Sequence, residues 1–357
     1  MLVGATRRAV LLSLIAAAGR AARNSVFPSE VFRYRDALTE FPVERLTSAE
    51  HSAWLPELHC RAASRRSTFV IYASDRAGAP QLFRLDHSTG ASWQLTEAAA
   101  LDRRFFTLLP GDRSLLYFDG LSLRTLAIDS LKDREIYRVR EGWRAVAGPA
   151  APPAKTPALI VEERDGVCEV RAIGLDRRRF ETVLHCAGMV DQAVPAPSGK
   201  EFCYVRDGSL GVASLDGRGE RAVITAEGRI GQVFWRPDGE ALLYLLTRGD
   251  GRSEIRETAV KGGADTLVAT TTRYAAFSPN ADGSVFAGVT GSAAQPHVVL
   301  LLRSTRKELT ICEHRASRPG EAAAVFSPDS QRVYFQSDAA GRPAIFSVRL
   351  NGVLEQT

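Results

Sequence analysis

The sequence predicts an all-β fold: a seven-bladed β-propeller of four-stranded sheets, closed by an N-terminal strand. Two distant segments share one hairpin motif, and helical periodicity is scarce along the chain. Weaker copies of the motif recur between them about every 40 residues, which is the repeat length of propeller blades. A closed all-β fold can hold the 357 residues in one domain.

The hairpin motif is clearest in residues 69–86 and 332–349. Each copy has an apolar strand, then Ser-Asp-x-x-Gly-x-Pro, then a second apolar strand. Gly78 and Gly341 can take the positive φ that a tight turn requires. The following Pro opens the second strand, where a missing N–H is tolerated. Both segments are therefore predicted to be hairpins of equivalent blades.

The weaker copies place a Pro, Gly or Asp turn before each hydrophobic strand. One blade lacks a clear turn, and residues 158–163 supply its strand. Together the repeats place blades near residues 66–98, 104–140, 142–187, 188–226, 229–270 and 273–314, with a seventh starting near 318.

The seventh blade is one strand short at the C-terminus. Residues 41–47 end in Leu-Thr, like residues 92–96 at the end of the first blade. We therefore expect 41–47 to pair with 344–350, which joins the ends of the ring and removes an open edge. The expected organisation is an export-like segment (1–24), an N-terminal segment with the ring-closing strand (25–65) and the propeller (66–357).

The N-terminus resembles an export signal. Arg7 and Arg8 precede a short apolar run at 9–18, which is followed by small residues. The Arg pair resembles a twin-arginine signal, and the run is shorter than the roughly 20 residues that span a bilayer. We expect export to the periplasm. The alternative is a short amphipathic helix on a cytoplasmic protein.

Composition narrows the range of partners. The net charge is only +5, and the basic residues are spread along the chain without a nucleic-acid motif. We therefore expect no nucleic-acid partner and no stable membrane span.

The five cysteines are far apart and lack C-x-x-C spacing, which favours buried apolar residues over a metal site. No nucleophile, Walker or Rossmann motif is present.

Scaffold motifs carry a resemblance to a known family. They read S-D-R at 74–76, F-W-x-P-D-G at 234–239 and F-S-P-D at 326–329. Residues 33–98 and 229–350 resemble the oligogalacturonate lyase family and, more distantly, TolB-like propellers. The resemblance implies cleavage of pectic oligouronides by β-elimination. In that family a divalent metal, usually manganese held by His, neutralises the uronate carboxylate while a basic side chain removes the adjacent proton.

The residues that the resemblance assigns to chemistry are replaced here. The family's His before the F-W motif falls on Gln232, and its metal ligands fall on Ala276, Arg318, Glu321 and Ala323. The standard metal site is therefore expected to be degenerate. We expect no cofactor, with manganese or calcium only if lyase chemistry of the family's kind persists.

Basic side chains at the starts of the inner strands are the remaining candidates for ligand binding. Several guanidinium groups at one channel mouth would attract carboxylates and hold them bidentately. The alternative is a row of solvated strand-end arginines. The candidates are Arg103 or Arg104, Arg144, Gln192, Gln232, Arg273, and Arg318 with Glu321.

The six histidines show no two-His ligand spacing, and structural or solvated roles are expected. His51 and His59 stand out because they lie in the segment that enters the first blade.

Two function classes stay open. The first is an oligogalacturonate-lyase-like propeller with a degenerate metal site. The alternative is a non-catalytic, TolB-like propeller that binds an anionic saccharide or a protein partner. The sequence leaves open whether the chain is an enzyme.

Overall fold

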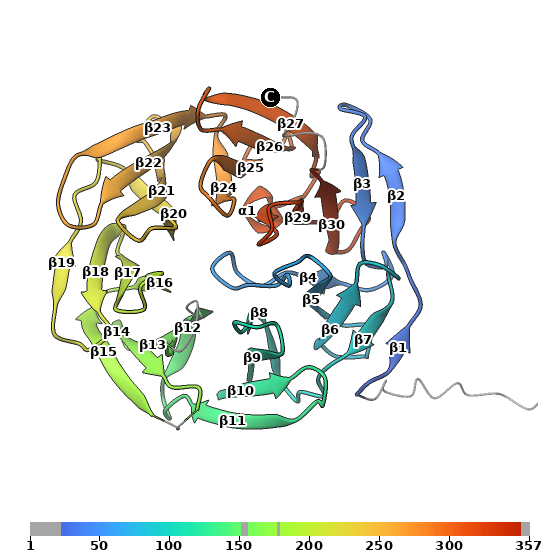
Figure 1. Ribbon diagram of the computed structural model, residues 1–357, viewed down its shortest axis with the longest axis horizontal. Helices are drawn as coiled ribbons and strands as arrows, with labels where there is room; N and C mark the ends of the chain where they lie inside the picture. The colour runs from blue at the N-terminus through green and yellow to red at the C-terminus, as the bar shows by residue number, and fades with distance from the viewer. Residues whose placement is uncertain (1–22, 151–155, 177–178, 351–357) are drawn as a thin grey trace, which may run out of the picture.

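The computed structural model describes residues 23–150, 156–176 and 179–350. These residues form seven antiparallel sheets around a central axis (Figure 1), which confirms the predicted seven-bladed propeller. From inner to outer strand, blade 1 consists of β4 (Ala53–Trp54), β5 (Phe69–Ser74), β6 (Gln81–Asp86), β7 (Ser92–Gln94) and β1 (Val26–Phe27). Blade 2 consists of β8 (Leu101–Leu108), β9 (Ser114–Asp119), β10 (Ser122–Ala127) and β11 (Asp133–Arg138). Blade 3 consists of β12 (Arg144–Ala150), β13 (Ala158–Arg164), β14 (Val167–Ile173) and β15 (Phe180–Ala187).

The remaining sheets follow the same order. Blade 4 consists of β16 (Val190–Pro195), β17 (Glu201–Arg206), β18 (Ser209–Ser214) and β19 (Glu220–Ala222). Blade 5 consists of β20 (Arg229–Trp235), β21 (Ala241–Thr247), β22 (Ser253–Ala259) and β23 (Asp265–Thr271). Blade 6 consists of β24 (Tyr274–Pro279), β25 (Val285–Thr290), β26 (His297–Leu302) and β27 (Lys307–Glu313). Blade 7 is β28 (Val325–Phe326), β29 (Arg332–Ser337), β30 (Ala344–Arg349), β3 (Pro42–Arg45) and β2 (Phe32–Arg35), with the one-turn helix α1 (Pro319–Ala322) before it.

Burial between neighbouring blades explains the apolar strands. In β21, Leu242 and Tyr244 pack toward blade 4, while Leu243 and Leu245 pack toward blade 6. Because successive side chains point to opposite faces, a middle strand with blades on both sides must be apolar throughout. The described residues form seven such buried clusters, one at each seam between blades.

A hydrogen-bonded set of Tyr, Arg and Asp side chains, here called the polar tie, recurs toward the outer edge of the blades. The Tyr117 hydroxyl on β9 donates to Asp133 Oδ2 on β11 at 2.6 Å, and Arg124 Nε on β10 donates to the same carboxylate at 2.9 Å. The tie links the second, third and fourth strands of the sheet. In blade 5 the corresponding residues are Tyr244, Arg256 and Asp265.

The N-terminal strand closes the ring as predicted. In β3, Val43 faces Val348 and Arg45 faces Phe346 of β30. β2 then adds a further strand outside β3, so the ring-closing strand is not the outermost strand of blade 7. A buried cluster that includes Tyr72 and Ile345 fills the seam between the last and first blades.

A strap formed by residues 26–35 gives a second closure that the repeats did not reveal. β1 pairs with β7 in blade 1, whereas β2 pairs with β3 in blade 7, so the strap crosses the seam outside both blades (Figure 1). Glu30 accepts two hydrogen bonds from Arg76, at 2.9 and 3.0 Å. The Arg76 guanidinium also lies 3.8 Å from the ring centre of Phe27. The arginine of the S-D-R motif is therefore a structural residue.

The first blade begins ahead of its repeat motif, because β4 at Ala53–Trp54 is its inner strand. The segment 25–65 thus contributes four strands to the ring. Most of the export-like segment 1–24 lies outside the described residues. Arg23, which is described, donates from its backbone N to Glu97 Oε1 and forms an ion pair with Asp133 at 2.7 Å. No helix in the described part of the chain is long and apolar enough to cross a membrane.

The cysteines are all buried and free, which confirms the expectation of buried apolar residues. Four of them lie on strands, whereas Cys60 lies in the segment between β4 and β5. Their wide spacing in the sequence did not predict that any two would be neighbours. Cys168 and Cys186 are nevertheless direct cross-strand partners on β14 and β15.

Candidate ligand site at the channel mouth

The inner strands carry β-bulges close to the channel mouth. The pairing register shifts between Leu101 and Phe106 on β8, and shorter shifts occur on β12, β16, β20 and β24. A bulge breaks the alternation of a strand and re-aims its side chains. Residues in these bulges therefore reach the channel even where simple alternation does not place them there.

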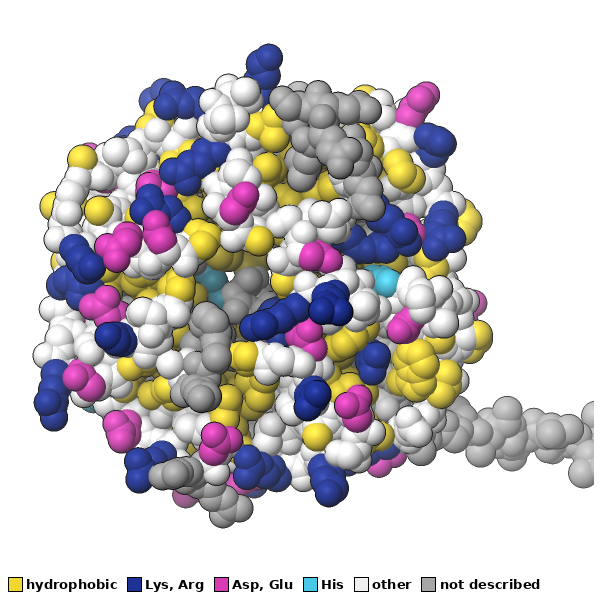
Figure 2. Space-filling model, viewed as in Figure 1, with side chains coloured by type: hydrophobic (Ala, Val, Ile, Leu, Met, Phe, Trp, Pro, Cys, Tyr) yellow, Lys and Arg dark blue, Asp and Glu magenta, His cyan; other side chains and the backbone are white. Residues whose placement is uncertain are grey.

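A cavity of about 390 Å³ lies at this mouth. It is bounded by the chain from Trp54 to His59, by the bulges of β8, β16 and β20, and by the end of α1. Figure 1 shows the chain between β4 and β5 reaching toward the axis. Figure 2 shows a hollow at the centre of one face, with Lys and Arg side chains beside it. Because several blades contribute, the completed ring is required to form the cavity.

Hydrogen bonds on both sides hold the segment from Leu55 to Cys60 in the channel. The Leu55 backbone N–H donates to Gln336 Oε1 of blade 7 at 3.0 Å. The Glu57 N–H donates to the Arg104 carbonyl of blade 2, also at 3.0 Å, and the Cys60 N–H donates back to the Glu57 carbonyl. These bonds fix the backbone of the segment, so the side chains that it presents are positioned in advance.

Two consecutive arginines from β8 line the cavity. Asp102 Oδ1 accepts the Arg104 backbone N–H at 2.9 Å, a local turn that fits the bulge. The Arg104 guanidinium pairs with the same carboxylate at 3.1 Å. Arg103 instead lies 4.4 Å from the ring centre of Trp54, and no described carboxylate forms an ion pair with it. Arg103 therefore offers an exposed, unpaired guanidinium at the cavity.

Glu57 presents a carboxyl group to the same cavity. No described residue donates a hydrogen bond to its oxygens. Burial raises the pKa of Glu57 to about 7; the Arg104 charge lowers it and the Asp102 charge raises it by smaller amounts. A carboxyl group that titrates near neutral pH can take up or release a proton during a reaction.

His59 and Gln232 leave polar atoms without partners in the cavity wall. The His59 Nδ1 and Gln232 Oε1 atoms are shielded from solvent and have no hydrogen-bond partner in the described structure. Burial lowers the pKa of His59 to about 4, and the Gln192 amide opposes this shift, so the imidazole is neutral at neutral pH. Unpaired buried polar groups carry a desolvation cost, so both atoms lower the stability of the fold.

The donor set of the cavity does not fit a metal ion. Asp191 and Glu321 also line it, but no three His, Cys, Asp or Glu side chains in the described residues are placed to hold one. Divalent transition metals in proteins need several such ligands together. Two of the positions that the resemblance assigns to ligands are alanines, of which Ala276 is fully buried on β24 and Ala323 lines the cavity.

The structure brings together part of the predicted site. Arg104, Gln232 and Glu321 line the cavity, and so do the further candidates Arg103 and Gln192. Gln192 is held by its own bonds: its Nε2 donates to the Gly231 carbonyl, and its Oε1 accepts the Val233 N–H.

Three predicted residues do not line this cavity. The Arg144 side chain forms an ion pair with Glu163 at 2.6 Å. Arg273 lies in the turn before β24 at a φ of 48°. Arg318 precedes α1 rather than an inner strand, and its side chain is 78% exposed in an ion pair with Glu321.

Glu57 was not among the residues predicted from the sequence. It lies in an irregular segment between two strands and belongs to no repeat or motif. The one sequence observation that pointed to this segment was that His59 enters the first blade, and His59 lies two residues after Glu57. Trp54, which positions Arg103, was also missed.

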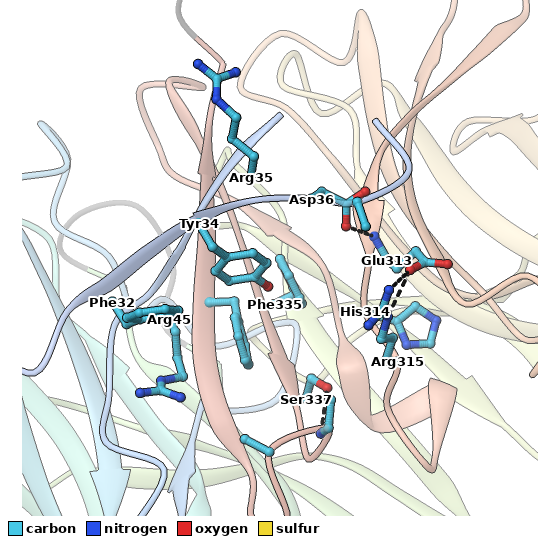
Figure 3. A pocket seen from close by; sticks show the side chains of 14 residues that line it. Phe32, Tyr34, Arg35, Asp36, Arg45, Glu313, His314, Arg315, Phe335 and Ser337 are labelled. Carbon is cyan, nitrogen blue, oxygen red and sulfur yellow. Dashed lines mark hydrogen bonds and ion pairs between the residues drawn. The ribbon is translucent and has the colours of Figure 1, made fainter. Parts of the chain in front are cut away.

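A second cavity of about 300 Å³ lies at the outer rim, between the strap and the end of blade 6. Figure 3 shows Phe32, Tyr34 and Arg45 on one side and Glu313 with Arg315 on the other. The polar groups here largely satisfy one another: Asp36 Oδ2 accepts the Glu313 N–H at 3.0 Å, and Arg315 pairs with Glu313. We assign this cavity to ring closure.

Comparisons with known proteins agree with the propeller fold. No protein-family profile matches the chain. The chain is 21% identical over 381 residues to an oligogalacturonide lyase of Pectobacterium atrosepticum, covering 92% of this chain and 98% of that protein.

Solved structures give the same result. An oligogalacturonate lyase in complex with manganese is 21% identical, with a TM-score of 0.87 over 94% of this chain and 100% of the other. An oligogalacturonate lyase of Vibrio parahaemolyticus is 19% identical, with a TM-score of 0.85 over 93% of this chain and 100% of the other. TolB propellers occur among the more distant neighbours.

The likeness covers nearly the whole of each chain, but the metal that one relative carries has no matching donor set in the described residues. The chain is therefore an oligogalacturonide-lyase-like, seven-bladed propeller whose channel mouth presents arginine, glutamate and neutral histidine, with no metal-ligand set among the described residues.

Proposed function

We propose that the channel-mouth cavity binds a short acidic oligosaccharide of the oligogalacturonide class, and that arginine holds its carboxylate in place of a metal ion. The observation that carries this proposal is Arg103, whose exposed guanidinium lies against Trp54 and lacks an ion-pair partner in the described residues. A guanidinium matches a carboxylate in shape and can donate two parallel hydrogen bonds to it.

The rest of the cavity suits a sugar acid. Trp54 and Leu55 line the cavity and offer apolar surface to the CH face of a sugar ring, beside the exposed Arg103 and Arg104 side chains. The volume of about 390 Å³ falls within the roughly 300–1,000 Å³ of small-molecule sites. Manganese or calcium, which lyase chemistry of the relatives' kind would call for, has no role in this proposal.

Calorimetric titration with trigalacturonate tests the proposal. We expect Arg103→Ala to weaken binding by about tenfold, since it removes a charge-assisted pair with the carboxylate. Added salt should also weaken binding, because the pair is exposed to screening. The matched control is Arg144→Ala, because Arg144 lies outside the cavity and pairs with Glu163.

Equal affinity of the wild-type protein and Arg103→Ala would place the saccharide elsewhere. Absence of binding to the wild-type protein would overturn the saccharide proposal and favour the protein-binding alternative.

We also propose that the chain is exported to the periplasm through the twin-arginine route, on the basis of Arg7 and Arg8 before the apolar run. Replacement of both by Lys should retain the protein in the cytoplasm of cells that express it. Unchanged periplasmic localisation would contradict this route, and an intact N-terminus by mass spectrometry would contradict cleavage of the signal.

A further inference from the structure

We propose that Glu57 is the general base of a metal-independent β-elimination in this cavity, acting on the proton next to a uronate carboxylate that Arg103 holds. The inference rests on the proposed binding function and adds a reaction to it. It also gives the role of base to Glu57, a position to which the resemblance to the lyase family assigns no function.

Geometry supports this role first. Glu57 and Arg103 line the same cavity but come from different blades. The Glu57 backbone bonds to the Arg104 carbonyl, so the carboxyl-bearing segment is anchored directly to the arginine pair. A uronate held by Arg103 through its carboxylate would present the neighbouring carbon within the cavity that Glu57 faces. The segments that carry the base and the carboxylate holder are thus joined by a backbone hydrogen bond.

The protonation behaviour of Glu57 agrees with the role. Burial raises its pKa to about 7, so near neutral pH it exists in both forms and is a stronger base than an exposed carboxylate. Arg104 and Asp102 of β8 are the charged groups that act on it, with opposite effects. Arg103, Asp191 and Glu321 line the same cavity, and His59 there is neutral.

The reaction balances without any co-reactant. Glu57 takes the proton from the carbon next to the carboxylate, and the C–H electron pair becomes a double bond to the neighbouring ring carbon. The bond from that carbon to the glycosidic oxygen breaks, and the oxygen keeps the electron pair and takes a proton from water. The hydroxide formed recovers the proton from Glu57. Arg103 stabilises the negative charge that develops on the carboxylate.

Turnover of trigalacturonate by the full chain, with a chelator present, tests the inference. Ultraviolet absorbance reports the unsaturated product. We expect kcat to rise with pH through the pKa of Glu57 and then level off, because the base must be deprotonated. Glu57→Gln should lower kcat by about 100-fold or more while the affinity measured by calorimetry stays within about twofold. The matched control is Glu240→Gln, an exposed carboxylate that pairs with Lys261 at 3.2 Å.

The outcomes separate this inference from the binding proposal. Binding without product, product at the wild-type rate from Glu57→Gln, or product that disappears with the chelator would each overturn the role of Glu57 and leave the binding proposal standing. Absence of binding would overturn both.

Discussion

Glu44 and Arg332 join the two ends of the chain: Arg332 Nη1 lies 2.6 Å from Glu44 Oε2 across 288 positions of sequence. Their side chains are 9% and 8% exposed. Glu44 lies on β3, the ring-closing strand, and Arg332 on β29 of the same blade. Arg349 and Arg33 also bond to the Glu44 carboxylate. The ring is therefore closed by a buried ion-pair cluster as well as by backbone pairing.

Glu44→Gln should destabilise the protein by about 3 kcal/mol at neutral pH, because it leaves Arg332 buried beside a neutral group. Burial alone would raise the pKa of Glu44, but hydrogen bonds from Arg332 and Arg33 outweigh it and lower the pKa from 4.5 to about 2.

A depressed acid pKa gives stability that is present above pH 4.5 and is lost as the pH falls toward about 2. Urea denaturation should therefore show a gap between wild type and Glu44→Gln that shrinks as the pH falls through this window. A constant gap across the window would contradict the ion-pair account.

Deleting residues 1–48 should destabilise the fold by at least about 5 kcal/mol, because it removes the strap, the Glu44 cluster and the buried Val43 and Leu46 side chains. Thermal unfolding followed by circular dichroism measures this. The control deletion of residues 1–22 retains every contact described for the strap. Similar melting curves for both deletions would show that the N-terminal strands do not close the ring.

Gly211→Ala should cost about 1–3 kcal/mol, because a methyl group there would overlap the Tyr204 ring and disturb its hydrogen bond to Glu220. The control in the same blade is Gly219→Ala, since nothing lies within 4 Å of a methyl group at that position. Chemical denaturation of both variants should separate them by at least about 1 kcal/mol. Equal stability would mean that the tyrosine ring does not lie across Gly211.

Glu57→Gln should stabilise the fold at neutral and alkaline pH. Because the pKa of Glu57 is raised from 4.5 to about 7, the unfolded chain releases this proton at lower pH than the folded chain. The wild-type protein therefore loses stability as the pH rises across that window, and the variant does not.

Melting temperatures should accordingly coincide at roughly pH 4 and favour Glu57→Gln above about pH 7. A variant less stable than the wild type above this window would assign Glu57 a structural role instead. Gain of stability on removal of a group is typical of functional residues.

The sequence predicted the blades because the repeat is a property of packing: every blade needs a turn, two buried strands and a new turn at the same interval. The pairing of 41–47 with 344–350 followed from the missing strand. The strap could not be predicted in this way, because β1 has only two residues, Val26 and Phe27, and its partner β7 is set by tertiary contacts.

The site was predicted only in part for a related reason. The candidate residues were chosen by their position at the start of an inner strand, with Arg103 and Arg104 as alternatives. The bulge on β8 instead brings both arginines to the cavity, and α1 takes the place where an inner strand was expected at Arg318. Glu57 lies on irregular backbone, whose course depends on hydrogen bonds to Gln336 and Arg104 from distant blades.

Metal dependence of saccharide binding tests the central claim most directly. The affinity for trigalacturonate should be measured on one preparation, first with a chelator and then with excess manganese. The arginine-based cavity predicts binding in the chelator and an affinity that manganese leaves within about twofold. Binding that appears only when manganese is added would contradict the account, because it would mean that a metal ion and not Arg103 holds the carboxylate.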